Sequence, residues 1–166
     1  MVTIRPYRSG DLQDCRALWV ELTAHHRGIY RDDTIGGDDP GAQFDRHLAA
    51  VGPDRIWVAD DGGAVVGLAG LIVDGTEGEV EPVVVASTRR GEGVGRMLVE
   101  AVVDAARGLG IRFLSVRPVA RNAEALRFFH RMGFGILGHV EAFMDLTGRQ
   151  DRWVAGETLA GRDFQV

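Results

Sequence analysis

The spacing of apolar residues along the chain predicts four helices. After Asp11, and again from Val94, apolar residues recur every three or four positions, which is the pattern of a helix with one buried face. A shorter helix is expected at 42–51, and another at 122–134. The stretch between the first two helices is rich in Gly and Asp and has no period, so it is expected to be a long loop.

Runs of β-branched residues predict the strands between these helices. "VTIRPY" is expected to open the chain as a strand, and residues 55–86 indicate two or three more, joined by the turns "DDGG" and "DGTEG". "IRFLSVRPV" and "GILGHVEAFMDL" predict a strand before and after the last helix, and the tail 148–166 is expected to add a final one. The pattern indicates an α/β (α+β) chain with a mixed sheet of six or seven strands.

Composition limits what kind of protein this is. A chain of 166 residues that is 45% hydrophobic can bury one sizeable core, so residues 1–166 are expected to form a single domain. The net charge of −5 argues against nucleic acid and anionic membranes as partners. The single cysteine, Cys15, excludes an intrachain disulfide and fits a reducing compartment. With no apolar signal core or membrane span in the sequence, we expect a cytoplasmic location.

A basic, glycine-rich turn opens the third helix. In "RRGEGVGRMLVEAVV", residues 89–103, three glycines follow two arginines and lead directly into the apolar period. Such a turn lets an anion reach the free N–H groups and the positive end of the dipole at a helix N-terminus, as phosphate requires. The stretch lacks the Lys-Ser/Thr pair of a Walker loop and matches G-x-G-x-x-G in neither register. What remains is Arg90-x-x-Gly93-x-Gly95.

This pattern resembles the pyrophosphate-binding motif of the GNAT superfamily of N-acetyltransferases. A second stretch, "NAEALRFFHRMGF" at 122–134, resembles a later motif of the same family, in which an Asn opens a helix with paired aromatic residues that closes on Gly-Phe. The two motifs stand in the family's order, with one strand between them. The resemblance implies the GNAT fold, with acetyl-CoA as co-substrate and splayed central parallel strands at 80–86 and 111–117.

The resemblance also implies where coenzyme A contacts the chain. The pyrophosphate is expected on the glycine turn, and backbone groups of strand 80–86 are expected to bond the pantetheine arm. Asn122 fits a helix N-cap as well as a coenzyme contact. The expected coenzyme A contacts are Val83, Val85, Arg90, Gly91, Gly93, Val94, Gly95, Arg96, Asn122 and Phe129.

Acetyl transfer by direct attack on the thioester needs a base, because an alkylammonium must lose its proton first. Glu79 and Glu81 are two residues apart on one strand and so share a face. Glu81, beside Pro82, is the preferred base, acting through water, while Glu79 also fits a solvated carboxylate. The Val85 N–H is the candidate donor to the oxyanion.

The chain departs from the family at Phe129, where the family usually carries a tyrosine that protonates the coenzyme A thiolate. His130 is adjacent but lies about 100° round the helix, so it is a candidate acid and equally a candidate solvated residue. A thiolate with a pKa near that of cysteine, ~8.5, leaves unassisted. The function expected is acetyl transfer to a primary amine in a ternary complex; the alternative is a non-catalytic coenzyme A-binding sensor or partner module.

The acceptor amine stays open from the sequence, as a small molecule or a peptide. Four aspartates of the loop, at 32, 33, 38 and 39, suggest a cationic acceptor or simply a solvated loop. No pair of histidines has H-x-x-x-H spacing, so no metal is expected. The apolar stretch "HVEAFMDL" suggests a homodimer.

Overall fold

The computed structural model describes residues 1–148 and 153–166. The four α-helices of this part are α1 (Leu12–Tyr30), α2 (Gly41–Val51), α3 (Val94–Gly108) and α4 (Ala123–Arg131). The strands are β1 (Thr3–Pro6), β2 (Ile56–Asp61), β3 (Ala64–Asp74), β4 (Glu77–Val85), β5 (Phe113–Ser115), β6 (Ala155–Leu159) and β7 (Arg162–Gln165). All four predicted helices are confirmed, as are the strands at the start of the chain and across 55–86.

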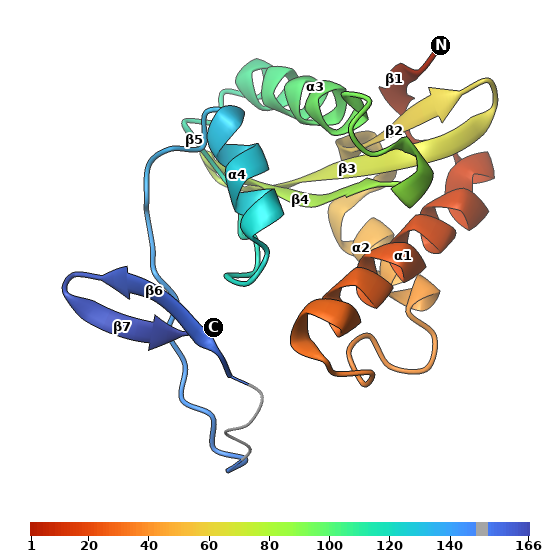
Figure 1. The fold of residues 1–166 in the computed structure, drawn as a ribbon. Coiled ribbons are helices and arrows are strands. Elements are labelled where there is room, and N and C mark those ends of the chain that lie inside the picture. The colour runs from red at the N-terminus through yellow and green to blue at the C-terminus, as the bar shows by residue number, and fades with distance from the viewer. Residues whose placement is uncertain (149–152) are drawn as a thin grey trace.

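Five strands form one mixed sheet in the order β1-β2-β3-β4-β5. The first four are antiparallel neighbours, whereas β4 and β5 run parallel. Helix α3 covers one face of this sheet and helices α1 and α2 cover the other (Figure 1). Within the described residues no helix is both long and apolar enough to span a membrane.

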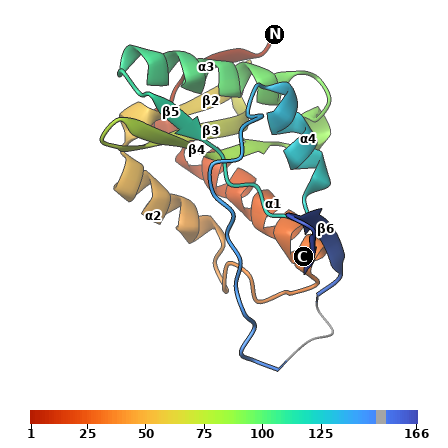
Figure 2. The same ribbon diagram turned by 90° about the vertical axis from the view of Figure 1, so that its left-hand side faces the viewer.

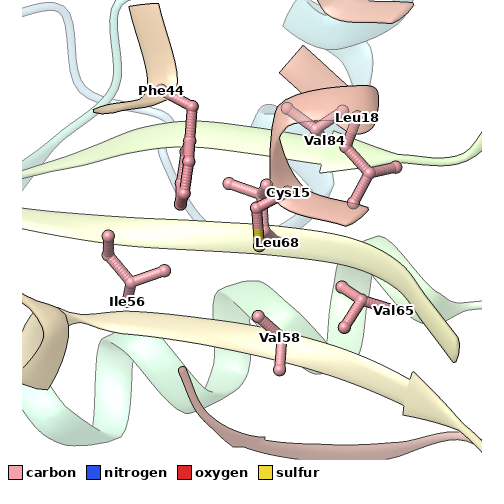
Figure 3. Close-up of a cluster of buried hydrophobic side chains, with 8 residues drawn as sticks. All are labelled: Cys15, Leu18, Phe44, Ile56, Val58, Val65, Leu68 and Val84. Carbon is pink, nitrogen blue, oxygen red and sulfur yellow. The ribbon is translucent and has the colours of Figure 1, made fainter. Parts of the chain in front are cut away.

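The core lies on both faces of the sheet because neighbouring residues on a strand point in opposite directions. On β3, Leu68 packs under α1 and α2 while the next residue, Ala69, packs under α3. Figure 3 shows the first of these clusters, in which Cys15 and Phe44 are completely buried. Burial raises the pKa of the Cys15 thiol to about 12. That thiol is therefore a packing group rather than a nucleophile.

Asp11 precedes α1, as predicted, but its carboxylate does not cap the helix. It accepts hydrogen bonds from both Nη atoms of Arg5 at 2.8 Å and from the Arg8 backbone N–H at 2.7 Å. The bonds from Arg5 hold the pKa of this buried carboxyl below its usual range. Asp11 therefore ties the start of α1 to β1.

The prediction of a strand at 135–146 was wrong. The segment has no regular structure and is exposed, and the tail forms β6 and β7, an antiparallel hairpin outside the main sheet. A strand persists only where its backbone groups find a partner strand, and the segment does not pair with β5. Residues 149–152, at the start of the predicted tail strand, lie outside the described residues.

β3 and β4 approach each other closely near the point where β4 and β5 run parallel. The register of the two strands shifts between Ala69 and Leu71. At Gly70, an added Cβ would lie 2.4 Å from the carbonyl oxygen of Glu81 and 3.0 Å from His47 Nε2, so only glycine fits there. Just before this point on β4, the pairing of β4 with β5 stops, at Glu79 opposite Ser115.

Candidate active site

The cleft opens where β4 and β5 part. Beyond Glu79, no strand of the described residues pairs with β4 on its β5 side, which agrees with the splay expected from the sequence. An open cleft of about 980 Å³ lies there, between β4, the glycine turn, the first turns of α3, and α4. Every expected coenzyme A contact lines this cleft: Val83, Val85, Arg90, Gly91, Gly93, Val94, Gly95, Arg96, Asn122 and Phe129.

The exposed edge of β4 presents free backbone groups to the cleft. The Ala86 N–H donates to the carbonyl of Val66, on the β3 side. Because successive residues of an antiparallel strand alternate in the direction of their N–H groups, those of Val83 and Val85 point the other way. The Val85 carbonyl also faces this side, since it accepts a bond from Arg90 Nε at 3.3 Å. The edge therefore offers an amide ladder to an extended ligand.

The glycine turn leaves the N-terminus of α3 uncovered. Gly91 and Gly93 have φ of +80° and +84°, a left-handed conformation that favours glycine. A Cβ at either position would meet no atom within 4 Å, so these glycines are required by the backbone conformation and not by packing. Gly93 occupies the N-cap without any side-chain capping bond. The first N–H groups of α3 are thus available to an anion, which fits the pyrophosphate of coenzyme A.

The three arginines of this region have different roles. Arg89, outside the motif, forms ion pairs with Asp61 and, at 3.2 Å, with Glu92, so it holds the turn to the β2–β3 hairpin. Arg90 reaches across its own turn, to the Val85 carbonyl. Arg96 pairs with Glu100 one helical turn later, at 2.7 Å. Arg90 and Arg96 both line the cleft, as cations beside the α3 N-terminus.

Asn122 has the capping role that the sequence predicted, since its Oδ1 accepts a bond from the Ala125 N–H at 3.0 Å. Its Nδ2 lies 3.4 Å from Nε2 of His25 on α1. His25 also lines the cleft and was missed by the sequence reasoning, which considered it only as a metal ligand. No local signal marks it, because α4 meets it from 97 residues away in the chain.

Phe129 lies in the cleft within a cluster of three rings. Its ring packs edge-on against Phe128, with centroids 5.1 Å apart, and against Phe134, at 5.8 Å. Phe128 in turn lies near Gly95 at the start of α3, so this ring lies between α4 and the α3 N-terminus. His130 is exposed and does not line the cleft. The structure therefore does not bring it to the position of the absent tyrosine hydroxyl.

Glu79 and Glu81 have different surroundings although they share a strand. The Glu79 side chain is only 14% exposed and its Oε2 lies 3.4 Å from Arg117 Nε, whereas Glu81 is exposed. Burial raises the pKa of Glu79, the positive charge of Arg117 opposes this, and the negative charge of Glu81 adds to it. A carboxylate with a raised pKa is better suited to taking a proton near neutral pH. Neither glutamate lines the coenzyme cleft itself; both lie further along β4, toward its start.

The acidic loop between α1 and α2 is organised by its own aspartates. Asp32 accepts hydrogen bonds from the N–H and the hydroxyl of Thr34. Asp39 accepts one from the Ala42 N–H at the start of α2 and forms an ion pair with Arg16. None of the four aspartates lines the coenzyme cleft. Asp33 and Asp38 line a separate hollow together with Arg27, so a cationic acceptor at this loop stays a prediction. In the described part of the chain, no three His, Cys, Asp or Glu residues are placed to hold a metal ion.

Comparison with known proteins agrees with this geometry. The family model described as "Acetyltransferase (GNAT) family" matches residues 17–134, which span α1 to the ring cluster. The chain belongs to the GNAT family. It is an acetyl-CoA-dependent N-acetyltransferase of amine substrates.

Two curated GNAT relatives are similar over most of their length. The chain is 33% identical to the N-alpha-acetyltransferase RimI of Mycobacterium tuberculosis, over 89% of this chain and 87% of the relative. It is 28% identical to the L-methionine sulfoximine/L-methionine sulfone acetyltransferase of Salmonella typhimurium, over 78% of this chain and 79% of that protein.

Solved structures support the GNAT fold. An acetyltransferase of the GNAT family from Staphylococcus aureus superposes with a TM-score of 0.64 at 18% identity, covering 80% of this chain and 84% of that one. A ribosomal-protein-alanine N-acetyltransferase from Brucella melitensis gives 0.62 at 24% identity, covering 79% and 83%. At these identities the likeness concerns the fold alone.

Proposed function

We propose that this GNAT protein transfers the acetyl group of acetyl-CoA to the α-amino group of an amino acid or peptide. The observation that carries the proposal is the splayed edge of β4, where a free amide ladder leads to the uncapped N-terminus of α3. Such an edge suits the pantetheine arm of acetyl-CoA, with the thioester next to Val85 and the diphosphate at the glycine turn. The amine then attacks directly within a ternary complex.

Glu79 is the proposed base, with Glu81 beside it. Partial burial and the like charge of Glu81 raise the pKa of Glu79, so it holds a proton more readily than an exposed carboxylate. Since it lies beyond the coenzyme cleft, it takes the ammonium proton through water. The nitrogen attacks the thioester carbon, the Val85 N–H donates to the developing oxyanion, and collapse expels the thiolate.

The thiolate departs without a side-chain acid in this proposal. Phe129 has no proton to give, and His130 lies outside the cleft. A thiolate with a pKa of ~8.5 is a fair leaving group at neutral pH, and solvent protonates it afterwards. The missing tyrosine therefore lowers the rate without preventing the reaction.

The α-amine as acceptor is supported by what the relatives act on. RimI is named an N-alpha-acetyltransferase, the Salmonella typhimurium relative acts on methionine derivatives, and a 26% identical Escherichia coli relative is an L-amino acid N-acyltransferase. The α-amino group of a peptide, with a pKa of ~8, also provides more free base at neutral pH than a lysine side chain.

A panel of amines tests the proposal, with thiol release from acetyl-CoA as the readout. Free amino acids, peptides with free N-termini, and N-blocked lysine peptides are compared at equal concentration. We expect release with an amino acid or peptide and little with the N-blocked peptides. Release only with the blocked lysine peptides contradicts the α-amine assignment, and binding of acetyl-CoA without turnover of any amine favours the non-catalytic module.

A homodimer and a cytoplasmic location stay predictions. The homodimer is supported by the apolar stretch at 139–146, whose large side chains are exposed. The location is supported by the reduced, buried Cys15 and by a site adapted to acetyl-CoA, an intracellular metabolite.

A further inference from the structure

The start of α4 is joined to α1 beside the coenzyme cleft. Asn122 Nδ2 lies 3.4 Å from Nε2 of His25, and both residues line the cleft. Arg121 Nη1 donates to the carbonyl of Ile29 at 3.2 Å, and its guanidinium lies 5.2 Å from the Tyr30 ring. The contacts on α1 all belong to its C-terminal half, which lies beside the start of α4 (Figure 2). We name the contact between His25 and Asn122 the clasp.

The bonds of Asn122 determine which nitrogen of His25 carries a hydrogen. The Oδ1 of Asn122 accepts from the Ala125 N–H, so its Nδ2, which can only donate, faces His25. Nε2 of His25 must then accept, and a neutral imidazole that accepts at Nε2 carries its hydrogen on Nδ1. A protonated imidazole has a hydrogen on both nitrogens and cannot accept. The clasp therefore forms only while His25 is neutral.

The position of helix α4 depends on few contacts. None of its residues is buried, so little apolar packing holds it against the rest of the molecule. The ring of Phe128 lies near Gly95 of α3, and the clasp joins the N-cap residue of α4 to α1. Ala125 and Phe129 of this helix line the cleft. A change at the clasp therefore changes a wall that the coenzyme contacts.

We propose that His25 is a positioning residue, which holds α4 where acetyl-CoA binding requires it by accepting the Asn122 amide as a neutral imidazole. Molecules in which the clasp is broken lack this wall of the cleft, so the apparent affinity falls with the fraction of molecules that are competent to bind. A hydrogen bond of ordinary strength changes such an equilibrium by about two- to tenfold. The inference rests on the proposed position of acetyl-CoA in this cleft and on no choice of acceptor amine.

The charged and titratable groups on the elements around His25 belong to α1, to the start of α4 and to the glycine turn. They are Glu21, His26, Arg89, Arg90, Arg121 and Glu124. Among these residue types, only histidine ordinarily titrates between pH 5 and 8. The His26 ring lies 6.2 Å from the His25 ring, and burial lowers the pKa of His26, to which the positive charge of His25 adds. His26→Gln is therefore the matched control.

The first test is the affinity of the full-length protein for acetyl-CoA, measured by calorimetry at pH 7.5 and pH 5.5. The 3′-phosphate of the coenzyme itself gains a proton near pH ~6, so the loss of affinity is compared between proteins and not read from one protein alone. His25→Gln offers an acceptor oxygen at both pH values. We expect wild type and His26→Gln to lose about fivefold more affinity than His25→Gln. Equal losses in wild type and His25→Gln overturn the proposal.

The second test observes the clasp without coenzyme. Two-bond ¹H–¹⁵N spectra of the imidazole rings report which nitrogen is protonated, and the signals lost in His25→Gln identify His25. We expect the Nδ1–H form at pH 7.5. Asn122→Asp still caps α4 but presents only acceptors, so it is expected to move the hydrogen to Nε2. An Nε2–H form in wild type overturns the clasp alone. A wild type with the Nδ1–H form that does not bind acetyl-CoA overturns the coenzyme site, and with it this role of His25.

Discussion

Replacing Glu79 by glutamine is expected to slow acetyl transfer by about 10²-fold in kcat/KM. General bases contribute ~10²–10⁴-fold, and the low end applies here for two reasons. The base acts through water, and an α-amine with a pKa of ~8 is already about a tenth unprotonated at pH 7, so part of the reaction bypasses the base. A hundredfold loss corresponds to about 2.7 kcal/mol of transition-state stabilisation. Glu81→Gln is expected to cost only about threefold, because that side chain is exposed.

The dependence of the rate on pH distinguishes a base from a merely structural carboxylate. The base works deprotonated, so activity falls as the pH drops through the pKa of Glu79. Arg117 lowers this pKa and Glu81 raises it. Arg117→Gln is therefore expected to move the acid limb of the profile to higher pH, and Glu81→Gln to move it to lower pH. A general loss of structure would not move the acid limb in opposite directions in these two variants.

The assay is thiol release from acetyl-CoA between pH 5.5 and 9, with the best α-amine of the panel as acceptor. Acetyl-CoA affinity by calorimetry and the thermal melt are the controls, and both are expected to be close to wild type in all three variants. If Glu79→Gln keeps its rate within threefold of wild type, Glu79 is not the base. If Glu81→Gln shows the hundredfold loss instead, the role belongs to Glu81.

Three further predictions concern the coenzyme, the leaving group and the fold. Gly95→Asp adds a negative charge beside the expected pyrophosphate, and its Cβ makes only ordinary van der Waals contacts. We expect it to abolish acetyl-CoA binding in calorimetry while the protein still melts cooperatively; unchanged affinity refutes the pyrophosphate site. Phe129→Tyr is expected to leave the rate level or raise it, most below pH 7 where thiolate expulsion is hardest; a lower rate at every pH contradicts unassisted departure. Asp11→Asn is expected to cost about 2–3 kcal/mol in urea unfolding at pH 7. Because bonding to Arg5 lowers the Asp11 pKa, the difference in unfolding free energy between wild type and variant is fully present above pH ~4 and shrinks as the pH falls further. If the difference at pH 2 equals that at pH 7, the ion pair with Arg5 is not its cause.

Local chemistry explains why the glycine turn was predictable from sequence. The left-handed backbone at Gly91 and Gly93 and the cap at Asn122 depend on residues within a few positions of each other, so a short motif specifies them. The helices were predictable for the same reason, since their apolar period is a local property.

Long-range geometry explains what the sequence did not predict. Residues 136–146 have the alternating pattern of a strand, but a strand forms only where a partner strand lies beside it, and in the structure these residues do not pair with β5. His25 joins the cleft through a contact made across most of the chain. The difference between Glu79 and Glu81 depends on where the segment after β5 places Arg117 and on how deeply each carboxylate is buried. Neither follows from their spacing of two residues.

Gly70 does not line the coenzyme cleft, but it allows β3 and β4 to approach each other closely beside it. The carbonyl of Glu81 fits against β3 only because position 70 has no side chain, and His47 of α2 borders the same space, with its Nε2 3.0 Å from where a Cβ would lie. Even a methyl group there would force β3 and β4 apart, close to the point where β4 separates from β5. A mutational library restricted to residues that line the cleft leaves out Gly70 and His47, although both limit how β3 and β4 pack beside it. Directed evolution toward bulkier acyl groups therefore has reason to begin behind the sheet.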